Sequence, residues 1–207
     1  FDKSFYSIGY VLFIGQFLSW IIEKSDRILI TEFLDTASTG KYGIGYQFGM
    51  IVLMVQVAIS KAWMPRIIEN FKYKRLNTIK KDIFKISLIL FILCCILSTF
   101  SYFFITKFLN EEYLISATIS VIVSFAYMID GIWKLYNGIL IYDNKYLLST
   151  ISVFFAGIIN VILNYLFLSD YGIIFAAFST LISFSAGLLF SSFIVHFKLK
   201  IFTHDTQ

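Results

Sequence analysis

The chain is short of charge, of proline and of cysteine. Of its 207 residues, 58% are apolar and only 14% are charged, with one proline and two cysteines, and the mean hydropathy is +0.80. About a quarter of the residues in a soluble domain are charged, so too few polar side chains are present to cover a surface in water. Cys94 and Cys95 are adjacent within one apolar run, where we expect packing residues rather than a disulfide. The composition excludes an ordinary soluble domain and predicts a membrane protein.

Long apolar runs fill the chain. A helix needs about 20 residues to cross about 30 Å of hydrocarbon, and six runs reach or exceed that length: residues 5–34, 37–64, 83–105, 113–141, 146–168 and 172–197. We therefore predict an all-α integral membrane protein, a six-transmembrane-helix bundle that forms one domain over residues 1–207. The first residue is Phe rather than Met and the first run begins almost at once, so we expect the chain to be part of a longer product.

Basic residues are distributed unequally between the two sides that six spans define. One side carries Lys41 and Lys107, and the other carries Lys3, Lys61, Arg66, Lys72, Lys74, Arg75, Lys80, Lys81, Lys85, Lys145, Lys198 and Lys200. Lysine and arginine are enriched in cytoplasmic loops, which predicts that both ends of this segment face the cytoplasm.

Residues 71–85 are the longest basic loop of this reading. They carry Ile79, Ile83 and Phe84 at helical spacing among lysines, which predicts a short surface helix whose lysines meet lipid phosphates. Basic loops beside spans set topology and contact anionic lipids. We expect membrane lipids and no nucleic acid as partners of this surface.

A first group of charged residues interrupts the first run. It consists of Glu23, Lys24, Asp26 and Arg27, and apolar residues resume at position 28. Charged side chains are costly at bilayer depth and rarely face lipid. Helical spacing places Trp20, Glu23, Arg27 and Thr31 on one face. The alternative is that the helix ends at Ile22 and the charges lie among the lipid headgroups.

A second charged group lies inside the fourth run, with apolar residues on both sides. Asp130 and Lys134 share a helix face with Tyr127 and Asn137, because their spacings are three and four residues. The structural alternative is an ion pair that neutralises itself and holds helices together.

Other polar residues within the runs have two readings. The fifth run has Asn160 and Asn164 one turn apart, and the second has Tyr46, Gln56 and Ser60. Hydrogen bonds between helices explain them as well as a wet cavity does. The sequence shows no catalytic constellation, no metal-ligand spacing around His196 or His204 and no dinucleotide fingerprint among its glycines, so we expect neither an enzyme nor a metal site.

Three stretches resemble a known family. Residues 25–30 read Ser-Asp-Arg-Ile-Leu-Ile, residues 40–46 read Gly-Lys-Tyr-Gly-Ile-Gly-Tyr, and the helix that follows ends in Trp-Met-Pro-Arg at 63–66. Tyr-Asn-Gly-Ile-Leu at 136–140, Asn160 with Asn164, and Tyr-Gly-Ile at 171–173 continue the likeness. The chain resembles the C-terminal six-helix lobe of Wzx-type polysaccharide (O-antigen) flippases of the multidrug/oligosaccharidyl-lipid/polysaccharide (MOP) superfamily, which have two MATE-like lobes.

The resemblance implies that the protein moves an oligosaccharide repeat unit of O-antigen, capsule or exopolysaccharide, linked to polyprenyl pyrophosphate, from the inner to the outer leaflet of the cell membrane. Its implied partners are the lipid-linked oligosaccharide, an N-terminal lobe or second chain, and other polysaccharide-assembly proteins. No cofactor is implied, and coupling to a proton or sodium gradient is expected.

The implied substrate assigns roles to the polar residues. Positive groups suit a pyrophosphate, and the candidates are Arg27, Lys24 and Lys134. Donors, acceptors and flat rings suit sugars, and the candidates are Asn137, Tyr127, Trp20, Tyr46, Gln56 and Asn160. The candidates for ion coupling are Asp130, Asp26 and Glu23.

Three alternatives stay open at this point. A multidrug cation exporter of the same superfamily would favour an acidic cavity, whereas three basic and three acidic residues are interspersed here. A polytopic membrane enzyme of polysaccharide assembly would need a large outer loop, and the predicted outer loops are short. The third alternative is a scaffold that transports nothing.

Overall fold

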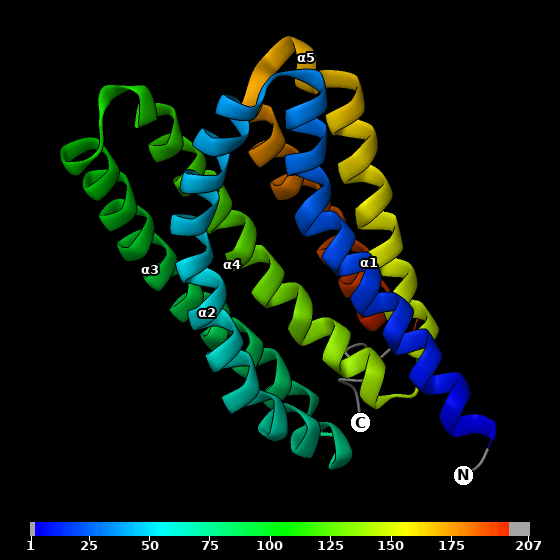
Figure 1. The fold of residues 1–207 in the computed structure, drawn as a ribbon. Helices are drawn as coiled ribbons and strands as arrows, with labels where there is room; N and C mark the ends of the chain where they lie inside the picture. Colours follow the sequence, from blue (N-terminus) through cyan, green and yellow to red (C-terminus); the bar gives the residue numbers. More distant parts are fainter. Residues whose placement is uncertain (1–2, 199–207) are drawn as a thin grey trace.

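The computed structural model describes residues 3–198, which are almost entirely helical (Figure 1). The α-helices are α1 (Lys3–Phe33), α2 (Thr36–Lys72), α3 (Leu76–Phe108), α4 (Leu114–Tyr142) and α5 (Tyr146–Phe193). A 3₁₀ turn, Glu111–Tyr113, precedes α4, and a π-helical turn, Ile194–Lys198, continues α5. The prediction of an all-α fold is confirmed.

The first helix runs without interruption through its charged residues to Phe33. Residues 16–34 contain neither glycine nor proline, so nothing in the backbone chemistry ends the helix at Ile22. The alternative in which the helix stops there is wrong.

The second and third helices are longer than predicted and meet at a tight turn. α2 continues past Pro65 to Lys72 and α3 begins at Leu76, so residues 79–84 are the first turns of α3 and not a separate surface helix. Proline removes one backbone hydrogen bond. This loss is tolerated because α2 and α3 pack together around one apolar cluster, in which Ile67 of α2 and Ile79 of α3 are fully buried.

The fifth helix is two antiparallel legs. Gly172 has φ 67° and ψ −167° inside α5, a conformation open to glycine and strained for other residues, and Figure 1 shows the chain turning back at the label α5. The rings of Phe155 and Phe190 lie 5.9 Å apart, which a straight helix would not allow for residues 35 positions apart. The two legs correspond to the predicted runs 146–168 and 172–197.

By length and apolar composition, four helices of the described residues are suited to cross a membrane: Thr36–Lys72, Leu76–Phe108, Glu111–Tyr142 and Tyr146–Phe197. This number is lower than the six spans predicted. The last two predicted spans are the legs of one helix, and α1, whose second half carries five charged residues, is not among the four. The chain is a multi-pass membrane protein.

The fourth helix is the centre of the bundle. In the apolar window of α4, 61% of the residues are buried, against 28% for each of the other three spanning helices. α4 packs against α2, α3 and both ends of the α5 hairpin, while α1 packs mainly on α5 (Figure 1). Most polar residues of α4 are therefore surrounded by protein rather than by lipid, and Lys134 is a partly exposed exception.

Glycines allow α2 to approach α4 closely. A Cβ atom on Gly45 would lie 2.5 Å from the backbone oxygen of Ser116, and one on Gly49 would lie 2.6 Å from Val123. Small residues at such positions are a common device for packing helices in lipid, where the hydrophobic effect does not drive helices together.

Candidate functional site

The intramembrane polar residues gather in two centres, one around Asp26 of α1 and one around Asp130 of α4. Both carboxylates are nearly or fully buried. A buried charge needs hydrogen-bond partners or an opposite charge, and the two centres meet this need in different ways.

The Asp26 centre is built from neutral donors. Asp26 is 0% exposed. Its Oδ2 accepts hydrogen bonds from the hydroxyls of Tyr42 and Thr180, both at 2.8 Å, and its Oδ1 accepts one from Nδ2 of Asn164 at 2.7 Å. Among the described residues no lysine or arginine pairs with this carboxylate. Three helices thus converge on one buried carboxyl group that has no basic partner among the described residues.

A second layer of hydrogen bonds orients these donors. The hydroxyl of Ser179 donates to Oδ1 of Asn164 at 2.9 Å, and Nδ2 of Asn160 lies 3.4 Å from the same hydroxyl oxygen. Ser25 donates to Oδ1 of Asn160 at 3.2 Å. These bonds link α1 with both legs of α5, so Asn160 acts in this structure as an interhelical link beside the carboxylate.

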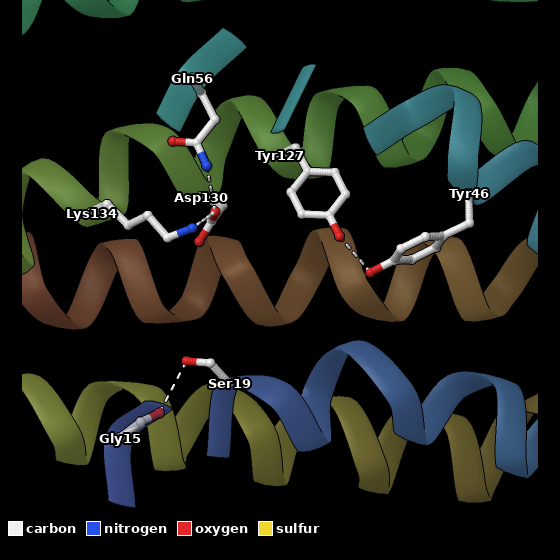
Figure 2. A network of polar contacts seen from close by, with 7 residues as sticks. All are labelled: Gly15, Ser19, Tyr46, Gln56, Tyr127, Asp130 and Lys134. Carbon is white, nitrogen blue, oxygen red and sulfur yellow. Dashed lines mark hydrogen bonds and ion pairs between the residues drawn. The ribbon is translucent and has the colours of Figure 1, made fainter. Parts of the chain in front are cut away.

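The Asp130 centre contains an ion pair. Nζ of Lys134 lies 2.6 Å from Oδ2 of Asp130, and Nε2 of Gln56 donates to the same oxygen at 3.0 Å. Figure 2 shows the carboxylate between the amide from α2 and the ammonium on its own helix. The Lys134 side chain is 44% exposed, so the ammonium lies at the edge of the bundle while the carboxylate of Asp130 is buried.

A column of tyrosines lies between the two centres. The rings of Tyr42 and Tyr46 are 5.5 Å apart and those of Tyr46 and Tyr127 are 5.8 Å apart, and the Tyr127 hydroxyl donates to the Tyr46 hydroxyl at 2.7 Å (Figure 2). The guanidinium of Arg27 lies over the Tyr46 ring, 5.3 Å from its centroid. This is a cation–π geometry, and it holds Arg27 beside the column.

A pocket of about 210 Å³ opens beside Asp130 between α1, α4 and α5. Its polar lining comes from Gln16 and Ser19 of α1, Asp130, Lys134 and Asn137 of α4, and Ser149 and Thr150 of α5. Oδ1 of Asn137 accepts hydrogen bonds from Ser191 at 2.9 Å and Ser152 at 3.2 Å. The pocket offers one ammonium, one carboxylate, amides and hydroxyls to a ligand.

The structure brings most of the predicted site residues together and leaves one apart. Tyr46, Gln56, Tyr127 and Asn160 are buried within the two centres, and Glu23 and Lys24 lie half-buried on α1 near Arg27. Trp20 is 55% exposed and stacks on Phe17 in a row of exposed rings. The indole continues the stripe of exposed rings that begins with Phe13 and Phe17. It therefore does not line the polar pocket.

Three residues of the Asp26 centre were not among the predicted site residues: Tyr42, Asn164 and Thr180. The sequence contained a signal for two of them, since Asn164 lies one turn from Asn160, and Tyr42 lies within the Gly-Lys-Tyr-Gly stretch at 40–43. Thr180 gave no separate signal, because in the sequence it reads as one member of a small-residue stripe. No group of three or more metal-ligating side chains occurs among residues 3–198.

Comparison of the fold with solved structures gives two strong matches. Over 93% of this chain and 44% of the other, it superimposes on an outward-facing multidrug resistance MATE family transporter of the MOP superfamily, with a TM-score of 0.64 and 16% identity. The fold is that of one lobe of such a transporter. A MOP superfamily transporter from Pyrococcus furiosus, described as having a binding pocket of reversed polarity, matches with a TM-score of 0.70 and 19% identity over 92% of this chain.

The chain spans 44% of the length of each of these two MOP transporters. No protein-family model matches the sequence, and no curated protein matches it. The likeness therefore lies in the fold, and both neighbours are transporters and not enzymes.

Proposed function

We propose that this chain is one lobe of a membrane transporter, which works together with an N-terminal lobe or a second chain. The observation that carries the proposal is the match of over nine-tenths of the chain to less than half of two MOP superfamily transporters. Two buried carboxylate centres inside a membrane bundle support it, because ionisable groups at bilayer depth mark transport pathways. Alternating access would move the two lobes against each other around a ligand.

The substrate that we propose is a polyprenyl-pyrophosphate-linked oligosaccharide, flipped from the inner to the outer leaflet of the cell membrane. Lys134 is partly exposed and Arg27 is half-buried beside the tyrosine column, and both could pair with a pyrophosphate. Asn137, Gln16 and the hydroxyls of the pocket suit sugar hydroxyls. Both ends of the segment would lie in the cytoplasm, and proteins of polysaccharide assembly would be further partners.

Export of organic cations is the second candidate. The carboxylate of Asp26 has three neutral donors and no basic partner among the described residues, and one structural neighbour is a multidrug resistance transporter. Against it, Lys134 compensates Asp130, and Arg27 lies beside the tyrosine column. The ammonium in the pocket and the guanidinium outside it are positive groups that would repel a cation.

The leaflet distribution of the lipid-linked oligosaccharide in the source cell tests the flippase proposal. We would compare the intact full-length gene, its deletion, Arg27→Ala, and Lys107→Ala as a control that removes an exposed basic residue far from both centres. Inner-leaflet accumulation is expected in the deletion strain and with Arg27→Ala, and normal delivery with Lys107→Ala. Normal outer-leaflet delivery in the deletion strain would overturn the flippase proposal and leave cation export or a scaffold.

We propose Asp26 as the residue that couples transport to a proton or sodium gradient. An ionised Asp26 is satisfied by three donors. A bound proton or sodium ion would require the Tyr42 and Thr180 hydroxyls to turn, which hydroxyls do readily. Because these residues lie on α1, α2 and α5, ion binding would change contacts between three helices at once.

Transport by the full-length protein in liposomes, driven by a proton or a sodium gradient applied separately, tests this role. Asp26→Asn is expected to abolish the stimulation by the gradient. Asp82→Asn is the matched control, since Asp82 is also buried but pairs with Arg66 at the α2–α3 end. Retained stimulation in Asp26→Asn would show that the coupling ion binds elsewhere.

A further inference from the structure

The side chain of Gln56 is satisfied on one side only. It is fully buried in α2, and its Nε2 donates to Oδ2 of Asp130. Its Oε1 is buried and has no hydrogen-bond partner among the described residues. A buried amide oxygen without a donor is costly and rare in native structures. A donor for this oxygen is therefore expected in another state of the protein.

The nearest group able to become that donor is Asp130 itself. An ionised carboxylate only accepts hydrogen bonds, whereas a protonated one also donates one. A carboxylic acid and a primary amide form two parallel hydrogen bonds, in which the acid O–H donates to the amide oxygen and the amide N–H donates to the acid carbonyl oxygen. The bond from Gln56 to Asp130 is already half of this pair. Protonation of Asp130 would complete it.

Lys134 is paired with Asp130 in the present structure. The ion pair joins residues i and i+4 of one helix at 2.6 Å. It is local, and its ammonium lies at the exposed edge of the pocket, where a modest change of side-chain rotamer would release it. Asn137 adds a second donor to the same pocket. Its oxygen is occupied by Ser152 and Ser191, and its NH₂ group has no partner among the described residues.

An ammonium and a free amide N–H in one pocket are donors suited to an anionic oxygen ligand. We propose that an anionic phosphate group binds in this pocket by taking Lys134 from Asp130, and that Asp130 takes up one proton in the same step and uses it to donate a hydrogen bond to Oε1 of Gln56. One negative charge and one proton enter together, no covalent bond to phosphorus is formed or broken, and the net charge of the site is unchanged. Gln56 is a positioning residue in this exchange.

Electroneutrality explains why the two events belong together. If Lys134 turned to a phosphate while Asp130 stayed ionised, an unpaired carboxylate would remain in the bundle, which is strongly unfavourable. If Asp130 took up a proton while Lys134 had no other anion, an ammonium would remain unpaired. Each event therefore favours the other, and linkage makes the effect reciprocal.

The other elements around Asp130 add few ionisable groups. α1 contributes Glu23, which interacts electrostatically with both Asp130 and Lys134, and α4 contributes Tyr127. α2 presents the neutral Gln56, α3 presents the apolar Leu90 beside Gly131, and α5 lines the pocket with hydroxyls. Glu23 is the rival proton acceptor, and a variant at this position separates the two.

Proton uptake on ligand binding tests the exchange, without any measurement of transport. The full-length protein in phosphatidylcholine nanodiscs would be titrated with dimethyl phosphate, a monoanion that does not itself titrate near pH 7. Calorimetry in two buffers of different ionisation enthalpy gives the number of protons taken up. We expect about one proton per ligand. A second arm replaces part of the phosphatidylcholine in the nanodiscs with phosphatidylglycerol. Proton uptake when phosphatidylglycerol enters the nanodiscs would identify a lipid headgroup as the source of the phosphate.

The variants are expected to change the affinity for dimethyl phosphate in opposite directions, which a purely structural role of these residues would not produce. Asp130→Asn is expected to bind dimethyl phosphate at least 3-fold more tightly, because Lys134 is already free, and to take up no proton. Lys134→Gln is expected to lose at least 10-fold in affinity. Gln56→Met is expected to reduce proton uptake and affinity together, and Glu23→Gln and Lys107→Gln are expected to take up protons as the unmodified protein does.

Two results would overturn the proposal. One is the absence of proton uptake in both arms with the unmodified protein, and the other is loss of uptake in Glu23→Gln with uptake retained in Asp130→Asn. Although the identity of the natural ligand rests on the proposed flippase function, this assay does not. If the protein takes up a proton with phosphate but its deletion leaves the leaflet distribution unchanged, the proposed exchange is supported and the proposed flippase function is overturned.

Discussion

At the scale of single residues, two neighbours in the sequence have opposite surroundings. Asp26 is fully buried among neutral donors from α2 and α5, whereas Arg27 is half-buried and lies over Tyr46. Consecutive residues of a helix point about 100° apart, so one of the two faces the core when the other faces the rim. The Asp-Arg pair thus lies in two different environments and forms no ion pair among the described residues.

Gly45 and Gly43 give a matched pair of substitutions at this scale. Gly45→Ala places a Cβ 2.5 Å from a backbone oxygen of α4, and we expect a loss of about 1–3 kcal/mol from overpacking. Gly43→Ala meets no atom within 4 Å, and a gain of about 0.5–1 kcal/mol is expected because alanine favours the helix. Thermal unfolding in detergent compares them. Equal effects of both substitutions would contradict the close approach of α2 to α4.

At the scale of elements, short local signals decide where helices begin and turn. Asp35 lies in the turn before α2, and its Oδ1 accepts a hydrogen bond from the backbone N–H of Ser38 at 2.6 Å, as an N-cap does. Gly172 allows the two legs of α5 to fold back on each other. Between such signals the helices continue through a proline and through four charged residues.

The cap at Asp35 predicts a pH dependence. Hydrogen bonds from Ser38 lower the pKa of the Asp35 carboxyl, so the ionised form stabilises the folded state. This contribution is present above the pKa that Asp35 has in the unfolded chain, about 4, and is lost as the pH falls through the lower folded value. We expect Asp35→Ala to unfold at a lower temperature at pH 7, and to differ less from the unmodified protein at pH 3.

Asp35→Asn is the control for charge, since asparagine also caps helices. It is expected to retain more stability than Asp35→Ala at pH 7 and to lose the part of the pH dependence that belongs to Asp35. A difference between Asp35→Ala and the unmodified protein that is constant from pH 3 to pH 7 would argue against an ionised cap.

At the scale of the whole molecule, the antiparallel helices place the helix ends that carry most basic residues at one end of the bundle. The turn between α2 and α3, the turn between α4 and α5 and the start of α1 lie at one end of the bundle (Figure 1), and eight of the predicted cytoplasmic basic residues lie between positions 61 and 85. Lys200 lies outside the described residues. The fold thus gathers the charges that the positive-inside rule counts.

Cysteine accessibility tests this orientation. In a full-length background in which Cys94 and Cys95 are replaced by alanine, single reporters would be Lys72→Cys at the basic end and Asn110→Cys at the other end. Both positions are exposed. A membrane-impermeant maleimide applied to intact cells is expected to label Asn110→Cys alone, and both after permeabilisation. Labelling of Lys72→Cys in intact cells would reverse the orientation.

The sequence by itself determined the class of protein, the approximate position of every helical leg and the Asp130–Lys134 pair. These follow from composition, run length and i,i+4 spacing, which are local properties of the chain. Only the tertiary structure decided that Asp26 meets Tyr42, Asn164 and Thr180, which lie 16, 138 and 154 positions away, and that Trp20 faces outward. Such contacts depend on which face of each helix packs inward. That choice is made by the whole bundle, because burial of each polar group must be matched by partners from other helices.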